Sequence, residues 1–537
     1  MLRRFTGRLM CAVALGLAML AGPAHAALDE AALAGLAGDF QHRIETIEAL
    51  GVVGGEDARR VLDALEAGDL GVVAGRVVIV QGEAVAAAAS GETLEVAAGA
   101  VDTITVNNRV RRALGTARAA LALSSPERGE RLAAARTLAD DASPALPPAF
   151  ERALAAETDG EIRGVLARAA ARVNLASPDA AKRLQAVQAL GESSDPAVKN
   201  LLAALGEKKG DEWVEPSSEV RAAADMAIHA IDRRIAIAEG IGTLFSGLSL
   251  GSILLLAALG LAITYGVMGI INMAHGELLM VGAYATFVVQ GVFRTYLPAY
   301  VDGYVVAAIP VAFLAAALVG VAMERLVLRH LYGRPLESLL ATWGLSLVLI
   351  QAARVVFGPQ NVELANPAWM SGGIALAAGV VLPWNRIVIV GFAVFVLVLI
   401  WLMMQKTRLG MFVRAVTQNR AMAGCVGVPT ARVDTLAFAI GSGVAGLGGL
   451  ALSQIANVGP AMGTGYIVDA FMVVVLGGVG QLAGAVWAAL GLGIVAKFLE
   501  GWAGAVIAKI LVLVFIIVFI QKRPQGIFAL KGRFADS

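Results

Sequence analysis

Polar side chains that could bind a solute occur within or beside long apolar runs in the second half of this sequence. Removing such groups from water is costly, so side chains kept at membrane depth are candidates for binding or transport. An alternative explanation is that they mark helix ends at the membrane interface, where polar groups cap helices or reach water. The candidates for a translocation pathway are Asn272, His275, Glu277, Gln454, Asn457, Tyr466 and Asp469.

A second candidate site is the basic stretch from Gln405 to Val433. It has 29 residues, of which five are Lys or Arg and none is Asp or Glu. Short loops with such a basic excess stay in the cytoplasm. The pattern therefore predicts a surface that a partner inside the cell could contact, although a loop that only sets orientation explains the charge equally well.

The side chains of this basic stretch suit docking against a partner. Arg414 and Arg420 could pair with acidic residues of that partner, and Asn419, Gly427 and Pro429 are typical of turns and helix ends. Apolar contacts are expected from Leu409, Met411, Phe412, Val416 and Met422.

Several kinds of catalytic site are excluded or disfavoured. The chain has no Gly-Lys dipeptide, so it has no P-loop with which to hydrolyse ATP. The glycines from Gly441 to Gly449 fit the letters of a dinucleotide-binding loop, but they lie inside an apolar run, where close helix packing explains them better. Only Cys11 and Cys425 are present, and no spacing predicts a metal site. We expect no enzyme activity and no bound cofactor.

The elements that position these residues are predicted to be membrane-spanning helices. The hydrophobic share of the sequence is 58% and the mean hydropathy is +0.73. A span needs about 20 apolar residues, and splitting the run 466–500 near Gly480 gives nine crossings. Eight spans plus a re-entrant segment at 466–480 are the alternative. The apolar runs are 244–266, 277–293, 304–323, 338–357, 387–404, 434–456, 466–500 and 507–521.

The first part of the chain has the composition of an exported soluble domain. Residues 1–26 combine arginines, a short apolar core and an Ala-His-Ala cleavage pattern, which predicts a signal peptide. Residues 27–240 carry 33 acidic and 23 basic residues, whereas residues 241–537 carry 9 and 17. We therefore predict a periplasmic domain at 27–238, a membrane domain at 239–528 and a cytoplasmic tail at 529–537.

The predicted periplasmic domain contains weak internal repeats. The segment Arg131–Ala139 is similar to Arg183–Gly191, and Glu161–Ala169 is similar to Glu219–Ala227. Repeated helical segments of this kind favour HEAT-like hairpins. Between Val72 and Val106, β-branched segments bounded by glycine predict a small hairpin or two. The predicted fold class is an all-α polytopic membrane protein with about 8–9 transmembrane helices, preceded by a mostly helical, HEAT-like domain with a small β element.

Four ordered segments resemble the branched-chain amino acid ABC permease family. They are ITYGVMGIINMAHGELLMVGAY (263–284), the basic loop with its following helix (407–452), VDAFMVVVLGGVGQLAGAV (468–486) and RPQGIF (523–528). Within that family, INMAHGE (271–277), the VTQNRAMAGCVGV form of the loop and the long exported extension most resemble the urea ABC transporter permeases.

The resemblance implies an importer of two permeases and two ATPases in the bacterial inner membrane. A periplasmic substrate-binding protein would deliver a small neutral solute, a second permease subunit would pair with this chain within the membrane lipid, and the cytoplasmic ABC ATPase subunits would use the ATP. Nucleic acid has no part in this assembly. The coupling segment carried over from the family comprises Arg408, Leu409, Gly410, Phe412, Arg414, Asn419, Arg420 and Gly427.

Other functions stay open at the level of sequence. A permease for branched-chain amino acids or short amides would carry the same motifs. A transmembrane sensor that uses the exported domain would need a cytoplasmic output domain, and the longest predicted internal segment has 29 residues. A membrane enzyme lacks a convincing set of catalytic residues.

Overall fold

The computed structural model describes residues 29–82, 84–94, 101–140, 146–377, 380–523 and 526–528. The chain divides into two compact units, Met1–Arg234 and Ile235–Ser537, and each is treated by itself. The predicted signal peptide at 1–26 and the tail at 529–537 lie outside the described residues.

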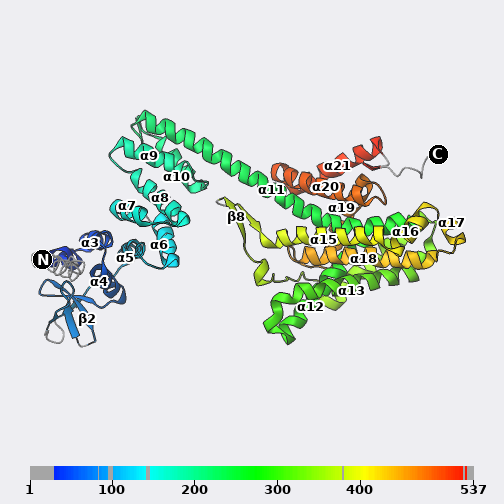
Figure 1. Ribbon diagram of the computed structural model, residues 1–537, viewed down its shortest axis with the longest axis horizontal. Helices are drawn as coiled ribbons and strands as arrows, with labels where there is room; N and C mark the ends of the chain where they lie inside the picture. The colour runs from blue at the N-terminus through cyan, green and yellow to red at the C-terminus, as the bar shows by residue number, and fades with distance from the viewer. Residues whose placement is uncertain are drawn as a thin grey trace, which may run out of the picture. The chain divides into compact units, whose positions relative to one another are not determined.

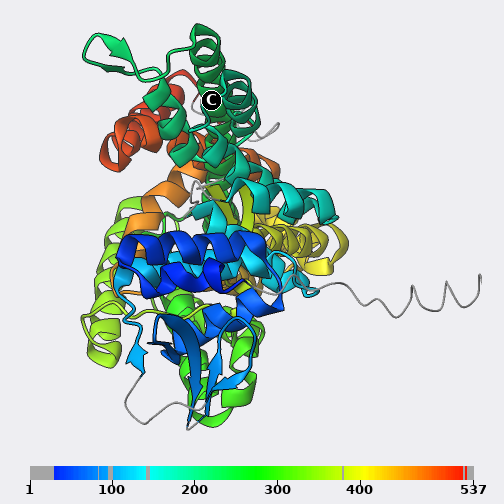
Figure 2. The same cartoon turned by 90° about the vertical axis from the view of Figure 1, so that its left-hand side faces the viewer.

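The first unit begins with short helices that cover an antiparallel sheet (Figure 2). The sheet joins five described strands in the order β4-β3-β2-β1-β5, where the sequence predicted only a hairpin or two. Leu62 and Leu65 of α4 share one core with Leu70, Val77 and Ile79 of the strands. The elements are α2 (Glu30–Leu33), η1 (Ala34–Ala37), α3 (Phe40–Val53), α4 (Glu56–Ala67), β1 (Leu70–Val73), β2 (Arg76–Gln81), β3 (Ala84–Ala87), β4 (Thr93–Leu94) and β5 (Asp102–Thr103).

Helices stacked in sequence order fill the rest of the first unit (Figure 1). They are α5 (Asn108–Ala122), α6 (Arg128–Asp140), α7 (Pro147–Ala156), α8 (Gly160–Asn174), α9 (Ala180–Leu190) and α10 (Pro196–Leu205), followed by the hairpin β6 (Lys208–Lys209) and β7 (Glu212–Trp213). Asp159, Asp179 and Asp195 cap α8, α9 and α10, because each side chain accepts hydrogen bonds from backbone N–H groups of the first turn.

The repeat seen in the sequence has a structural counterpart in two arginines. Arg131 of α6 pairs with Glu157 at 2.8 Å, and Arg183 of α9 pairs with Glu215 at 2.8 Å. Both glutamates are buried. Each arginine also donates to two carbonyls of the Ser-Pro turn before its own helix, Ser125-Pro126 and Ser177-Pro178. The two copies are therefore anchored by the same contacts.

The second unit is a bundle of apolar helices. Among the described residues, eight helices are long and apolar enough to cross a membrane. They are α11 (Ser218–Met268), α12 (His275–Tyr296), α13 (Tyr304–Leu326), α14 (Pro335–Phe357), α15 (Trp384–Lys406), α18 (Thr430–Ser453), α20 (Leu482–Ala503) and α21 (Ala505–Lys522). The predicted 8–9 transmembrane helices are confirmed, and the count matches the alternative of eight spans rather than nine, because α19 (Met462–Gly477) has 16 residues, fewer than the ~20 that a span needs. Helix α11 is continuous across the boundary expected near residue 238.

Glycines let the central helices approach closely. A side chain at Gly282 of α12 would collide with the Gly446 backbone of α18, and one at Gly449 would collide with the Leu279 carbonyl. This confirms that the glycine run from Gly441 to Gly449 serves helix packing. Of the most apolar 18-residue stretch of each helix, 83% is buried in α18 but only 17% in α21. Helix α18 therefore lies at the centre of the bundle.

Short elements connect the long helices. The hairpin β8 (Gly373–Ala377) and β9 (Val380–Pro383) precedes α15, and η2 (Pro298–Gly303), η3 (Leu328–Leu331) and η4 (Ala368–Met370) are 3-10 turns. An isolated bridge joins Val362 to Val458, tying the segment after α14 to the segment after α18. The basic stretch folds into two helices, α16 (Arg408–Gln418) and α17 (Arg420–Cys425).

Candidate functional site

Helix α16 is held against the end of α15 by local contacts. Thr407 caps α16, because its hydroxyl accepts from the Gly410 N–H at 3.4 Å. Gly410 is buried on the Met404 backbone, and any larger side chain there would collide with it. Arg414 also donates to the Met404 carbonyl. The chain therefore reverses tightly, and α16 is fixed to the membrane bundle.

The two faces of α16 have different environments. Val413 and Val416 are buried in the bundle core, and the half-buried Leu409 and Phe412 pack against that core. Val416 is therefore too buried to meet a partner as expected, whereas contact of the partly exposed Leu409 and Phe412 with a partner stays a prediction. The spacing of these three side chains, three and four residues, is the pattern of an inward helix face, and it could have been recognised as such in the sequence.

The exposed apolar side chains of this region lie elsewhere. Met411 on α16 and Met422 on α17 are more than half exposed, as is Val426 just after α17, which the sequence analysis did not single out. Exposed apolar side chains on a loop of this kind are candidates for contact with a partner. We refer to Met411, Met422 and Val426 as the apolar docking patch.

The residues predicted to form turns and helix ends in the basic stretch do so. Asn419 caps α17, because its side chain accepts from the Met422 N–H at 3.0 Å. Gly427 has a φ of 88°, which an L side chain rarely adopts, and it ends the turn after α17. Pro429 then precedes α18.

Arg420 has a partner within the chain. Its guanidinium pairs with Asp434 of α18, with Nη1 at 3.1 Å from Oδ1, and it lies over the Tyr332 ring at 4.4 Å from the centroid. Asp434 is buried, and it is the first acidic residue after the basic stretch. Arg420 therefore fixes α17 to the bundle, and because its side chain is 40% exposed, the expected pairing with an acid on a partner stays a prediction. Arg408 is exposed.

Three of the predicted pathway residues lie in or just before the first turn of α12, and all three are buried. Glu277 accepts from Ser346 of α14 at 3.1 Å and from Thr464 of α19 at 3.2 Å, both at Oε1. His275 Nε2 lies 3.1 Å from the Ala257 carbonyl of α11, and Asn272 accepts from the Ala274 N–H. His275 and Glu277 therefore join helices of the bundle at the start of α12, and their part in a pathway stays a prediction.

Within the described part of the chain, these three side chains keep polar atoms that have no hydrogen-bond partner. The atoms are Asn272 Nδ2, His275 Nδ1 and Glu277 Oε2. Glu277 Oε2 faces Gly463, where an added Cβ would lie 2.8 Å away. A buried acceptor without a partner is costly, so this carboxylate retains capacity for a donor.

Gln454 belongs to a separate polar network. Gln454 is buried at the end of α18, and its Oε1 lies 3.1 Å from the Tyr304 hydroxyl. Tyr304 and Gln290 also reach the Ala365 carbonyl, at 3.1 and 2.8 Å. Asn457 is exposed in the following loop. The network therefore ties α12, α13 and α18 to the segment after α14.

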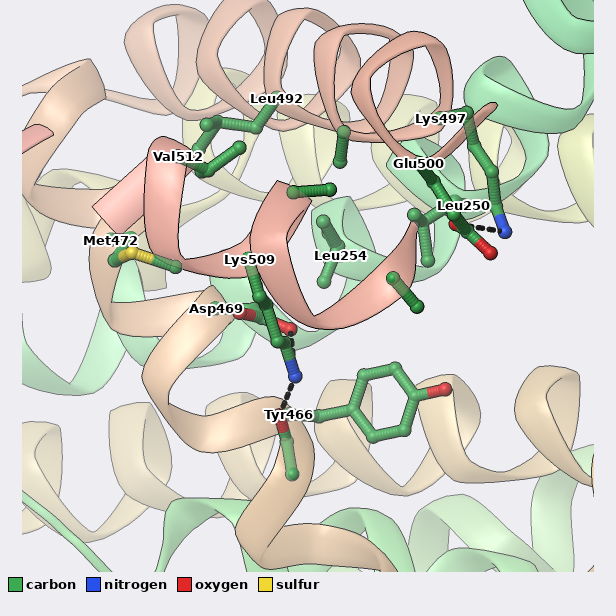
Figure 3. Close-up of a pocket in the computed structure, with 14 residues that line it drawn as sticks. Leu250, Leu254, Tyr466, Asp469, Met472, Leu492, Lys497, Glu500, Lys509 and Val512 are labelled. Atoms are coloured by element: carbon green, nitrogen blue, oxygen red, sulfur yellow. Dashed lines mark hydrogen bonds and ion pairs between the residues drawn. The ribbon is translucent and has the colours of Figure 1, made fainter. Parts of the chain in front are cut away.

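Tyr466 and Asp469 line a pocket on another face of α19 (Figure 3). Asp469 Oδ2 lies 3.4 Å from Nζ of Lys509 on α21, which the sequence analysis did not single out. The structure thus distributes the predicted pathway residues over three places: around Glu277, around Gln454 and around Asp469. Among the described residues, no group of three or more His, Cys, Asp or Glu could hold a metal ion.

Comparisons with known proteins give a consistent family for the second unit. The family model described as "Branched-chain amino acid transport system / permease component" matches residues 243–520. The high-affinity branched-chain amino acid transport system permease protein BraD of Pseudomonas aeruginosa is 29% identical over 290 residues, covering 53% of this chain and 94% of BraD.

Other relatives have similar sequence identity and coverage. LivH of Escherichia coli, a permease protein of the same kind of system, is 28% identical over 296 residues, covering 53% of this chain and 94% of LivH. A probable branched-chain amino acid transport permease protein of Methanocaldococcus jannaschii is 25% identical over 293 residues, covering 51% of this chain and 88% of the relative. No solved structure gives a significant match.

Proposed function

The chain belongs to the family of branched-chain amino acid transport system permease components, and on that premise we propose that it is the membrane-spanning permease subunit of an ATP-driven importer. The premise is supported by relatives that are matched over nearly their whole length. The sequence holds no P-loop, so the energy must come from a partner ATPase. The resemblance in the four motifs supports an assembly with two ATPases, a second permease and a periplasmic binding protein in the bacterial inner membrane.

The observation that carries this proposal is the apolar docking patch on a fixed loop. Met411, Met422 and Val426 are exposed, while the Arg420–Asp434 pair and the buried face of α16 hold the loop to the bundle. A patch fixed in this way can transmit a partner's movement to α15 and α18 as a rigid-body displacement. The lack of acidic residues from Gln405 to Val433 supports a cytoplasmic position and an acidic partner surface.

The substrate that the comparisons favour is a branched-chain amino acid. The relatives are named for branched-chain amino acid transport, and this supports the amino-acid alternative better than urea. Urea is the second candidate, favoured by the INMAHGE segment and by the long extension before the membrane unit. The extension, residues 27–238, is proposed to lie in the periplasm.

The test of the function is uptake by the complete importer. We expect the double variant Met411→Asp/Met422→Asp to reach the membrane at the normal level and to lose ATP-linked uptake, since it places acidic charge on the docking patch. Met226→Asp is the matched control, because Met226 is an exposed methionine of the first unit. Normal uptake in the double variant would contradict the coupling role. Labelled leucine and labelled urea, offered to the same membranes, distinguish the two substrates.

A further inference from the structure

The pocket beside Asp469 has an unusual combination of charge and apolar surface for a membrane bundle. It has a volume of about 350 Å³ and lies between α11, α19, α20 and α21 (Figure 3). That volume is at the lower end of the range for small-molecule sites. It suits a compact solute.

One wall of the pocket carries a loose pair of opposite charges. Lys509 Nζ lies 3.4 Å from Asp469 Oδ2 and 3.4 Å from the Gly465 carbonyl, both long contacts. The other pair at this pocket, Lys497 with Glu500, is closer at 2.7 Å. An ammonium has three donors and a carboxylate about four acceptor positions, so Asp469 and Lys509 each retain capacity for a ligand. Within the described residues, Asp469 has no other hydrogen-bond partner in its side chain.

The remaining walls combine apolar side chains with Tyr466, Lys497 and Glu500. In Figure 3, Leu492 and Val512 lie on one side of the cavity, Met472 beyond Asp469, and Leu250 and Leu254 of α11 behind it. A solute with both charges at one end and a small aliphatic group at the other would match the Asp469–Lys509 pair and these apolar side chains. Urea can form hydrogen bonds with Asp469 and Lys509, but it has no aliphatic group to place against the apolar side chains.

We propose that this pocket binds an aliphatic α-amino acid, with its ammonium on Asp469, its carboxylate on Lys509 and its side chain against the apolar wall. This inference rests on the proposed transport function and names the site that selects its substrate. Asp469 is 18% exposed in its side chain, and burying a carboxylate in a membrane bundle is costly, so binding an ammonium is a reason to keep it there. A phospholipid with an ethanolamine headgroup carries the same two charges, so the test must separate a free amino acid from a lipid.

The test measures equilibrium binding of labelled leucine to the purified complex of permeases and ATPases, without the periplasmic binding protein, in lipid nanodiscs, with leucine amide, isovalerate and urea as competitors. We expect Asp469→Asn to weaken leucine binding at least about tenfold, because a hydrogen bond to a charged group is lost. It should also remove the preference for leucine over isovalerate, which lacks the ammonium. Lys509→Gln should remove the preference over leucine amide, which lacks the carboxylate.

Two controls keep the result specific. Arg334→Gln changes an ion pair whose residues do not line the pocket and should leave leucine binding unchanged. Asp469→Glu retains the carboxylate and should retain selectivity over isovalerate, which separates recognition of the ammonium from a folding defect. Equal weakening of all competitors by Asp469→Asn, or unchanged leucine binding, would overturn the proposal.

The lipid arm compares nanodiscs of phosphatidylglycerol alone with nanodiscs that also contain phosphatidylethanolamine. Leucine binding in both preparations supports the amino-acid site, and loss of binding whenever phosphatidylethanolamine is present would assign the pocket to lipid. ATP-linked uptake by the unmodified importer is measured in parallel. If that uptake is intact while Asp469→Asn binds leucine normally, the pocket assignment fails and the transport function stands. If no solute is taken up, the transport function fails independently of leucine binding.

Discussion

Arg420 of α17 and Asp434 of α18 form an ion pair that fixes the basic loop to the membrane bundle. Asp434 is 2% exposed in its side chain, whereas Arg420 is 40% exposed and also lies over Tyr332. The carboxylate of the pair is therefore buried, whereas the guanidinium is partly accessible to solvent. The ion pair lets the exposed methionines of the loop keep a defined position relative to α18.

Removing Arg420 alone should loosen the loop. Arg420→Met leaves Asp434 buried without its partner, so we expect the free energy of unfolding to fall by about 1–3 kcal/mol. This loss of stability is smaller than for a fully buried ion pair, because the arginine is partly exposed. Asp434→Asn added to this variant should restore part of the loss. Thermal unfolding of the purified protein and protease cleavage within the loop measure both effects. Arg408→Met, on the same loop, is the control, and equal effects of the two arginine changes would refute the anchoring role.

Glu277 should be needed for transport rather than for folding. Glu277→Gln keeps the shape and the acceptor atom near Ser346 and Thr464, but removes the charge at an oxygen with no partner in the described residues. We expect normal membrane levels and an uptake rate lowered at least about tenfold, as for loss of a hydrogen bond to a charged group. Ser346→Ala, which deletes one donor, should have a smaller effect. An uptake rate equal to that of the unmodified protein would exclude Glu277 from the pathway.

The close contact of α12 with α18 should not tolerate a side chain. Gly282→Ala forces a methyl group into the Gly446 backbone, and overpacking of this kind costs about 1–3 kcal/mol. Gly291→Ala, on the same helix, meets nothing within 4 Å and should be neutral or slightly stabilising. The thermal midpoint of each purified variant checks the contrast. Similar midpoints for the two variants would show that the helices can separate without cost.

The first unit should lose stability in acid. Hydrogen bonds from Arg131 and Arg183 lower the pKa values of Glu157 and Glu215 below their usual 4.5. A lowered pKa in the folded state means that the stabilisation is fully present above about pH 4.5 and is lost as the pH falls through the lowered values. Thermal unfolding of the purified protein between pH 7 and pH 3 should show a falling midpoint.

The matched variant for this pH dependence is Arg131→Met/Arg183→Met. It should unfold at a lower temperature at pH 7 and should lose less of its remaining stability on acidification, because both carboxyls then have more ordinary pKa values. Arg152→Met is the control, since Arg152 donates to backbone carbonyls of α3 rather than to a carboxylate. The same pH slope in the double variant and in the unmodified protein would contradict the assignment.

The sequence was sufficient to predict structural features that depend on residues close together along the chain. The apolar runs predicted the long helices of the second unit, because a helix needs a continuous length of apolar residues to cross a membrane. The run 466–500 was split near Gly480, and the structure ends α19 at Gly477 and begins α20 at Leu482. The glycines of α18 were assigned to packing because they lay inside such a run, and this was confirmed. The family, too, was recognised from local motifs.

Only the tertiary structure decided which polar residues meet. Glu277 reaches Ser346 and Thr464, which are 69 and 187 residues away, and Asp469 reaches Lys509 on a different helix. Arg420 pairs with Asp434, which lies one residue beyond the acid-free stretch from Gln405 to Val433. Local periodicity tells which face of a helix is apolar, but it does not specify the neighbouring helix that covers that face. Partners brought together by packing become visible only when the bundle is assembled.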